Sequence, residues 1–188
     1  GMLGQNIPQA VAAAREMLAA VGSDFPVSIK IPTSNTPFVK VAEALCEAGI
    51  RYITCANSVH GLVPAELGDN YGGDEEIFQP SHEGVVSAVG YTGAGITPAS
   101  LASVHTLASA LRGKYPDLKI WGTGGMMSGK DGIAMMAAGA DGVQYATALI
   151  ERGVSIFEEA LSVLRWYCHL YGKEAMDVVG SLGGTVDF

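Results

Sequence analysis

Residues 122–147, GTGGMMSGKDGIAMMAAGADGVQYAT, decide the fold class of this chain. They follow the short apolar run LKIW (118–121), which predicts a strand that ends at the glycines. Ser128 is a helix-capping residue type, and KDGIAMMAAG predicts a helix that Gly139 ends. The run GVQYA (142–146) predicts the next strand. A strand, a helix and a strand in succession indicate a parallel βαβ unit.

The same alternation extends over the rest of the chain. Strands are predicted at 27–31, 50–56, 118–121 and 142–146, and helices at 8–21, 38–49, 97–113, 129–139 and 155–172. Apolar strands joined by helices predict an α/β fold with a parallel sheet buried on both faces. The segment 57–96 is irregular, with a possible hairpin near EEIF and GVVSAV. No linker composition interrupts residues 1–188, so a single domain is expected.

Composition excludes several classes of protein. The chain has 188 residues, with 19 acidic and 11 basic ones, and its net charge of −8 argues against a nucleic-acid partner. No apolar run reaches about 18 residues, so no membrane span is expected. Three cysteines (Cys46, Cys55, Cys168) match no metal-site spacing, and no secretory leader is evident. We therefore expect a cytoplasmic protein with reduced cysteines and no metal.

Two features point to an anionic ligand. Gly124 and Gly125 leave a strand just before the helix capped by Ser128, where backbone N–H groups bind phosphate, and the hydroxyl of Thr147 could donate to the same group. The plain alternative is a tight turn. Lys30 lies inside the apolar strand VSIKI, where a buried ammonium group needs a negative partner. Its alternative is a lysine at a sheet edge that extends into water.

Two further segments fit a small polar ring. Asn57 and Ser58 end the second strand, where an amide and a hydroxyl read carbonyl and N–H groups, although both residues also favour turns. In YTGAG (91–95), Gly93 allows a flat ligand to approach the backbone, and an ordinary loop is the alternative. Cys55 is expected to be a small buried hydrophobic residue.

Taken in order, VSIKIP (27–32), ANS (56–58), TGAGITP (92–98), GTGGMMSGKD (122–131) and GADGVQYATAL (139–149) resemble the dihydroorotate dehydrogenase family. The resemblance runs from about Pro8 to Gly184. It is closest to the soluble, fumarate-using branch through ANSVHG (56–61).

This resemblance implies a (β/α)8 barrel that binds FMN at its C-terminal rim and oxidises dihydroorotate to orotate, with fumarate as a possible acceptor. It implies that FMN contacts Lys30, Ser58, Gly93, Gly124, Gly125, Ala146 and Thr147. Asn57 and Ser58 would lie on the pyrimidine. At Ala146 the family usually has glycine.

The predicted strands number four, so the resemblance implies the C-terminal half of the TIM-type barrel. The catalytic base, a cysteine in the soluble branch, would lie in the other half and is not assigned here. Four strands leave two free edges and an uncovered inward face, which predicts a homo-oligomer or association with a missing N-terminal half. We expect the apolar residues of the strands to line that face. Two alternatives stay open: an inactive half barrel that binds a phosphate ligand or a partner chain, and a related flavin-dependent enzyme acting on pyrimidines.

Overall fold

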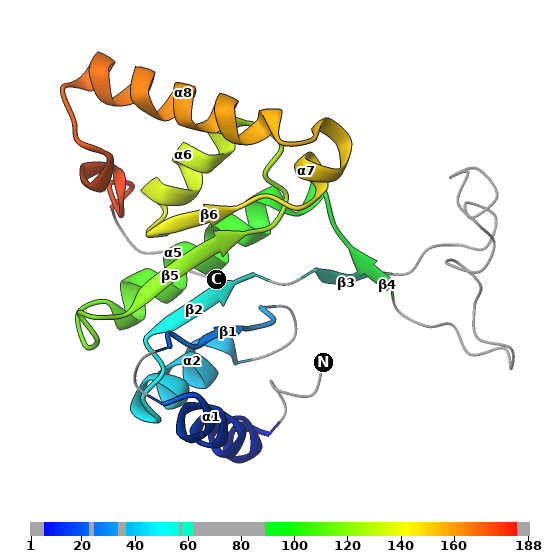
Figure 1. The fold of residues 1–188 in the computed structure, drawn as a ribbon, viewed down its shortest axis with the longest axis vertical. Helices are drawn as coiled ribbons and strands as arrows, with labels where there is room; N and C mark the ends of the chain where they lie inside the picture. The colour runs from blue at the N-terminus through cyan, green and yellow to red at the C-terminus, as the bar shows by residue number, and fades with distance from the viewer. Residues whose placement is uncertain (1–5, 23–24, 34–36, 57, 62–88, 184–188) are drawn as a thin grey trace, which may run out of the picture.

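The computed structural model describes residues 6–22, 25–33, 37–56, 58–61 and 89–183, and Figure 1 shows their arrangement. Its helices are α1 (Ile7–Val21), α2 (Phe38–Glu47), α5 (Thr97–Leu111), α6 (Gly129–Ala137), α7 (Thr147–Arg152) and α8 (Ser155–Tyr171), with 3-10 turns η1 (Ala94–Ile96) and η2 (Ala175–Val178). Its strands are β1 (Ser28–Lys30), β2 (Tyr52–Cys55), β3 (Val59–Gly61), β4 (Val89–Tyr91), β5 (Lys119–Thr123) and β6 (Gly142–Gln144).

Four of these strands form one parallel sheet in the order β1-β2-β5-β6. Helices connect them, because parallel neighbours need a crossover connection. The predicted α/β class, with four parallel strands and flanking helices, is confirmed. Among the described residues, the outer edges of β1 and β6 have no strand partner.

The helices begin where the sequence offers capping groups. Ser128 accepts a hydrogen bond from the N–H of Asp131, and the Asp131 carboxylate accepts one from the N–H of Ser128, which forms a capping box for α6. At α5, Pro98 occupies the first turn, where its missing N–H costs no hydrogen bond. The predicted starts of these two helices are therefore confirmed.

The hydrophobic core lies between the sheet and its helices. Ile29, Ile53 and Ile120 are in register on neighbouring strands, so they point to the same face. All three are buried against helical residues such as Leu45 and Leu107. Figure 1 shows α5 running behind this face of the sheet.

The opposite face of the sheet corrects the prediction of an apolar inward face. Lys30, Thr54 and Trp121 are in register, and this alternation places on the same face Ser28, Tyr52, Lys119, Thr123 and Gln144. Most of these side chains are polar. Ser28, Lys30, Trp121 and Gln144 are exposed, whereas Thr54 and Thr123 are buried. The prediction was wrong because a run such as VSIKI alternates in direction: its isoleucines face the helices and its lysine faces the open side.

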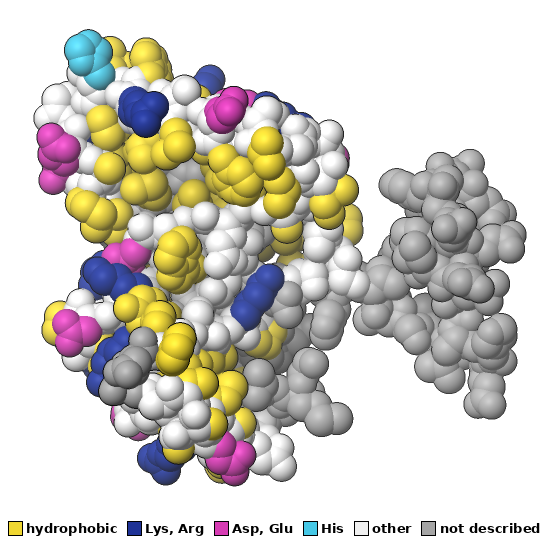
Figure 2. Space-filling view, in the orientation of Figure 1, with side chains coloured by type: hydrophobic (Ala, Val, Ile, Leu, Met, Phe, Trp, Pro, Cys, Tyr) yellow, Lys and Arg dark blue, Asp and Glu magenta, His cyan; other side chains and the backbone are white. Residues whose placement is uncertain are grey.

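Two outer features, the pairing of β3 with β4 and helix α7, were not predicted from the sequence. An antiparallel ribbon joins β3 to β4 and projects away from the main sheet (Figure 1). The hairpin predicted near EEIF and GVVSAV lies outside the described residues, apart from Val89 in β4. Ile150 of α7, Val154 between the two helices and Leu161 of α8 are exposed, and Figure 2 shows hydrophobic side chains gathered on this part of the surface.

Candidate functional site

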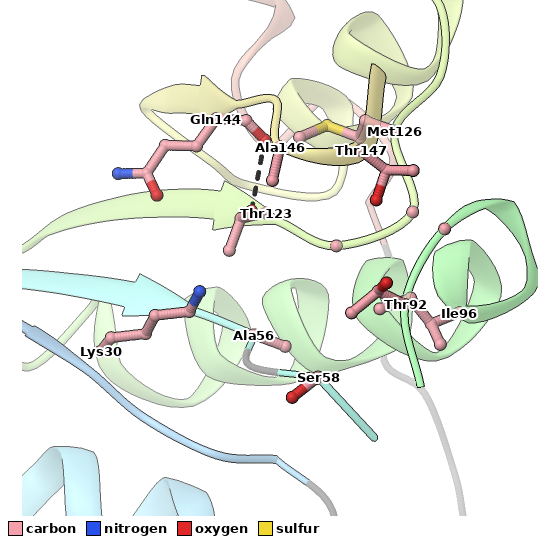
Figure 3. A pocket seen from close by; sticks show the side chains of 13 residues that line it. Lys30, Ala56, Ser58, Thr92, Ile96, Thr123, Met126, Gln144, Ala146 and Thr147 are labelled. Carbon is pink, nitrogen blue, oxygen red and sulfur yellow. Dashed lines mark hydrogen bonds between the residues drawn. The ribbon is translucent and has the colours of Figure 1, made fainter. Parts of the chain in front are cut away.

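A pocket opens at the C-terminal edge of the parallel sheet. Its lining comes from the ends of all four strands, from the loop before α5 and from the start of α7 (Figure 3). The residues that line it are Lys30, Ala56, Ser58, Thr92, Gly93, Ile96, Thr123, Gly124, Gly125, Met126, Gln144, Ala146 and Thr147. Ligands of α/β proteins usually bind at this edge, where the strands leave the sheet and the loops begin.

The structure brings together seven of the residues that the sequence indicated. This pocket is lined by all seven, although they are spread over 118 positions of the chain: Lys30, Ser58, Gly93, Gly124, Gly125, Ala146 and Thr147. Asn57, the remaining candidate, lies outside the described residues. Whether these residues bind a ligand stays a prediction.

Lys30 is the charged residue of the pocket. Figure 3 shows its side chain running from β1 into the pocket, with the ammonium group near the ends of β2 and β5. Among the described residues, no carboxylate forms an ion pair with it, and none of the residues that line the pocket is acidic. The pocket therefore carries positive charge in a chain whose net charge is −8, which favours an anionic ligand.

The loop after β5 contributes backbone donors. Within the described part of the chain, no hydrogen bond is donated by the N–H groups of Gly125, Met126 or Thr147. The Thr147 hydroxyl likewise has no partner there. Unpaired N–H groups beside a pocket satisfy themselves with water or with an anion.

The glycines of this loop also have a packing role. Gly125 has φ +79, and a Cβ there would lie 2.5 Å from the backbone N of Thr97. Gly124 has φ +114, and a Cβ there would meet Ser100 of α5. Close packing against α5 and left-handed backbone geometry therefore require glycine at both positions, independently of any ligand.

At the N-terminus of α6 the backbone donors already have partners within the chain, whereas the anion was predicted at Gly124 and Gly125, just before this helix. The Asp131 carboxylate accepts hydrogen bonds from the N–H groups of Met127 and Ser128, at 2.9 and 2.8 Å. Glu159 of α8 accepts one from the N–H of Gly129 at 3.0 Å. Carboxylates of the chain itself thus occupy this helix end, and the free donors lie earlier in the loop and at α7.

Glu159 is held in its ionised form by this contact. The hydrogen bond from Gly129 and that from Arg152 lower the pKa of the Glu159 carboxyl below its ordinary value. Because the group stays charged near neutral pH, it repels a second anion from the start of α6. The N–H groups that have no partner among the described residues therefore lie outside this helix end, at Gly125, Met126 and Thr147.

Two residues that the sequence reasoning missed also line the pocket. Thr123 and Gln144 are in register at the ends of β5 and β6, and the Thr123 hydroxyl donates to the Gln144 backbone oxygen at 3.2 Å. Gln144 presents an exposed amide to the open face. The alternation of side chains along GVQYA could have identified Gln144, because residues two apart in a strand, such as Gln144 and Ala146, point to the same side.

Lys30 is the one titratable side chain among the described residues that line the pocket. None of its lining residues is Asp, Glu, His, Cys or Tyr. Cys55, one residue away, is fully buried, and burial raises the pKa of its thiol to about 12, so it is no nucleophile at neutral pH. No cluster of three metal-ligating side chains occurs in the described ranges. None of the helices described is long and apolar enough to cross a bilayer.

Comparison with known proteins agrees with this architecture. Residues 3–165 match the family model described as dihydroorotate dehydrogenase. The dihydroorotate dehydrogenase (fumarate) of Saccharomyces mikatae is 30% identical over 159 residues, which cover 81% of this chain and 46% of that protein. The catalytic subunit of dihydroorotate dehydrogenase B (NAD(+)) of Pyrococcus furiosus is 36% identical over 92 residues, or 48% of this chain and 29% of that one.

A solved structure shows the same fold. The ligand-free type DHODH from Eimeria tenella superposes with a TM-score of 0.61 at 19% identity, over 83% of this chain and 40% of that chain. This chain spans less than half the length of the relatives that it matches.

Proposed function

This chain belongs to the dihydroorotate dehydrogenase family, and we propose that it binds the phosphate and one side of FMN for the oxidation of dihydroorotate to orotate. The observation that carries the proposal is the pocket at the strand ends. It combines one unpaired ammonium group with backbone N–H groups that have no partner among the described residues.

The residues of the pocket fit the phosphate end of FMN. In this proposal the N–H groups of Gly125, Met126 and Thr147 and the Thr147 hydroxyl donate to the phosphate oxygens. Hydrogen bonds from such donors to a charged acceptor are about twice as strong as those between neutral groups. Ala146 has φ −115, so its backbone does not need glycine, and its methyl group lies beside this donor set.

The remaining residues fit the ring end. Lys30, Ser58, Gln144 and Gly93 bind or approach the flavin, and Asn57 and Ser58 contact the pyrimidine. The flavin, when bound, supplies the hydride acceptor, and the protein orients the substrate against it. If FMN binds as proposed, the Lys30 ammonium group would lie on the ring side of the site and would stabilise negative charge there.

We propose that the catalytic base comes from outside the described pocket lining, in which Lys30 is the one acidic or basic side chain. Removal of a proton from dihydroorotate needs such a base. We propose that residues 1–188 form one domain that is completed by four further strands at the free edges of β1 and β6, from the same chain or from a partner. Fumarate as the electron acceptor and a cytoplasmic location belong to the same proposal.

A binding comparison tests this function. Flavin fluorescence should show that the chain binds FMN more tightly than riboflavin, which lacks the phosphate. Thr147→Val removes one donor and should weaken FMN binding about tenfold, without a change for riboflavin. Equal affinities for the two flavins would contradict the assignment of the phosphate site.

A second candidate is a half barrel that binds a phosphate ligand without catalysing a reaction, because the described residues that line the pocket include a phosphate-type donor set but no carboxylate or imidazole. Mixing the FMN-loaded chain with dihydroorotate under anaerobic conditions separates the two. Bleaching of the flavin absorbance supports the enzyme, and unchanged absorbance supports the binding protein.

A further inference from the structure

The loop before α5 and the loop after β5 are joined through one hydroxyl group. Thr97 Oγ1 lies 2.8 Å from the backbone oxygen of Gly125 and 2.8 Å from that of Ala94. A threonine hydroxyl has one hydrogen to donate, so it can serve one of these carbonyls fully at any moment.

The two carbonyl oxygens differ in whether they have a second hydrogen-bond donor. The oxygen of Ala94 also accepts the backbone N–H of Thr97, at the end of η1. Among the described residues, the oxygen of Gly125 has no donor other than the Thr97 hydroxyl. A partly buried carbonyl oxygen without a donor lowers the stability of the fold. The hydrogen bond from the Thr97 hydroxyl therefore contributes more at the Gly125 oxygen than at the Ala94 oxygen.

This contact sets the direction of the next N–H group. The peptide bond between Gly125 and Met126 is trans, so its C=O and N–H point in opposite directions. A Gly125 oxygen held toward Thr97 therefore turns the Met126 N–H away from α5. That N–H is one of the unpaired donors beside the pocket.

We propose that Thr97 is a positioning residue of the anion site. Its hydroxyl holds the Gly125 carbonyl against α5 and so presents the Met126 N–H to the phosphate group of the ligand. The inference rests on the proposed function for the identity of the ligand, whereas the orientation of the peptide does not depend on it.

The chain offers a matched control in the same helix. The Thr106 hydroxyl is buried and has no hydrogen-bond partner among the residues that the structure describes. Thr97→Val and Thr106→Val make the same chemical change in α5, and only the first removes the contact with Gly125. Thr97→Ser keeps the hydroxyl and should restore the behaviour of the unaltered chain.

The experiment measures FMN and riboflavin affinity for the unaltered chain and the three variants. Thr97→Val should weaken FMN binding about tenfold and leave riboflavin binding unchanged, because only the phosphate meets the Met126 N–H. Thr97→Ser and Thr106→Val should bind FMN as the unaltered chain does. Equal FMN affinity in Thr97→Val, or an equal loss for both flavins, would overturn the role of Thr97.

A second readout separates this inference from the proposed function. In ligand-free protein, NMR should show that Thr97→Val shifts the Gly125 carbonyl carbon and the Met126 amide, whereas Thr106→Val does not. If these signals shift but no form of the chain binds FMN, the proposed function fails, whereas the role of Thr97 in orienting the Gly125–Met126 peptide is supported. If the signals do not shift, Thr97 does not orient this peptide, and the inference is wrong whatever ligand the chain binds.

Discussion

Gly125 occupies a place where neither the backbone nor the surroundings accept a side chain. Its φ is +79, and a Cβ would lie 2.5 Å from the N and 2.8 Å from the Cα of Thr97. Both of these are backbone atoms at the start of α5, so no rotamer change relieves the contact. Gly125→Ala must therefore push the loop away from the helix.

The cost has two parts. A residue with a Cβ at left-handed φ costs about 1–2 kcal/mol, and overpacking against fixed atoms costs about 1–3 kcal/mol more. We expect about 3 kcal/mol in total, or a fall in Tm of about 9 °C for a chain of this length. Gly172 also has positive φ, +59, but nothing lies within 4 Å of a Cβ there. Gly172→Ala should therefore lose only the backbone part, about 1.5 kcal/mol or about 4 °C.

Thermal unfolding of the three proteins, with and without FMN, provides the assay. A ligand that binds only the native state raises Tm, so FMN should stabilise the unaltered chain and Gly172→Ala. It should stabilise Gly125→Ala much less, because the displaced loop no longer presents its donors. Equal falls in Tm for the two variants would refute the packing argument. Full stabilisation of Gly125→Ala by FMN would refute the assignment of this loop to the ligand.

Four other outcomes are expected. Lys30→Met should weaken FMN binding about 10- to 100-fold in a fluorescence titration, and Lys40→Met on the exposed side of α2 should not. Thr106→Val should raise stability by about 1 kcal/mol in urea unfolding, since it removes a buried hydroxyl without a partner, and a loss would show that the hydroxyl is satisfied. For Asp141, burial raises the carboxyl pKa, but Arg112, the N–H of Ile120 and Lys119 together lower it below the ordinary value. Its stabilisation is therefore complete above pH ~3.9 and is lost as the pH falls through the lowered pKa. Asp141→Asn should cost about 2 kcal/mol at pH 7 and progressively less as the pH falls below ~3.9. Light scattering at micromolar concentration should show association through the free edges of β1 and β6, and a stable monomer would contradict this expectation.

Local patterns in the sequence were enough to place most elements of the fold. Ser128 and Pro98 mark helix starts through groups within three or four residues of themselves, and the structure has both helices there. The same patterns indicated that Lys30, Gly125 and Thr147 come at the ends of strands or just beyond them. Since the four strands of the main sheet are parallel, their carboxyl ends meet at one edge, and one pocket contains these residues.

Such local patterns did not predict which face of the sheet each side chain points to, or which residues pair across the fold. The segment VSIKI is mostly apolar, but in the structure Ile29 points into the core and Lys30 points to the open face of the sheet. Helix α6 carries the expected cap, yet Glu159 arrives from α8 to fill its end, thirty residues along the chain. Neither outcome follows from neighbours in sequence.

The sequence by itself determined the order of strands and helices, the class of fold and the residue types at the strand ends, because these depend on periodicity and capping within a few residues. Only the tertiary structure decided which donors are free. Thr97 reaches the Gly125 oxygen across 28 positions, Asp131 and Glu159 satisfy the start of α6, and the N–H groups of Met126 and Thr147 are left without partners among the described residues. The physical reason is that each hydrogen bond has one donor, so the free groups are known only once packing has assigned the rest.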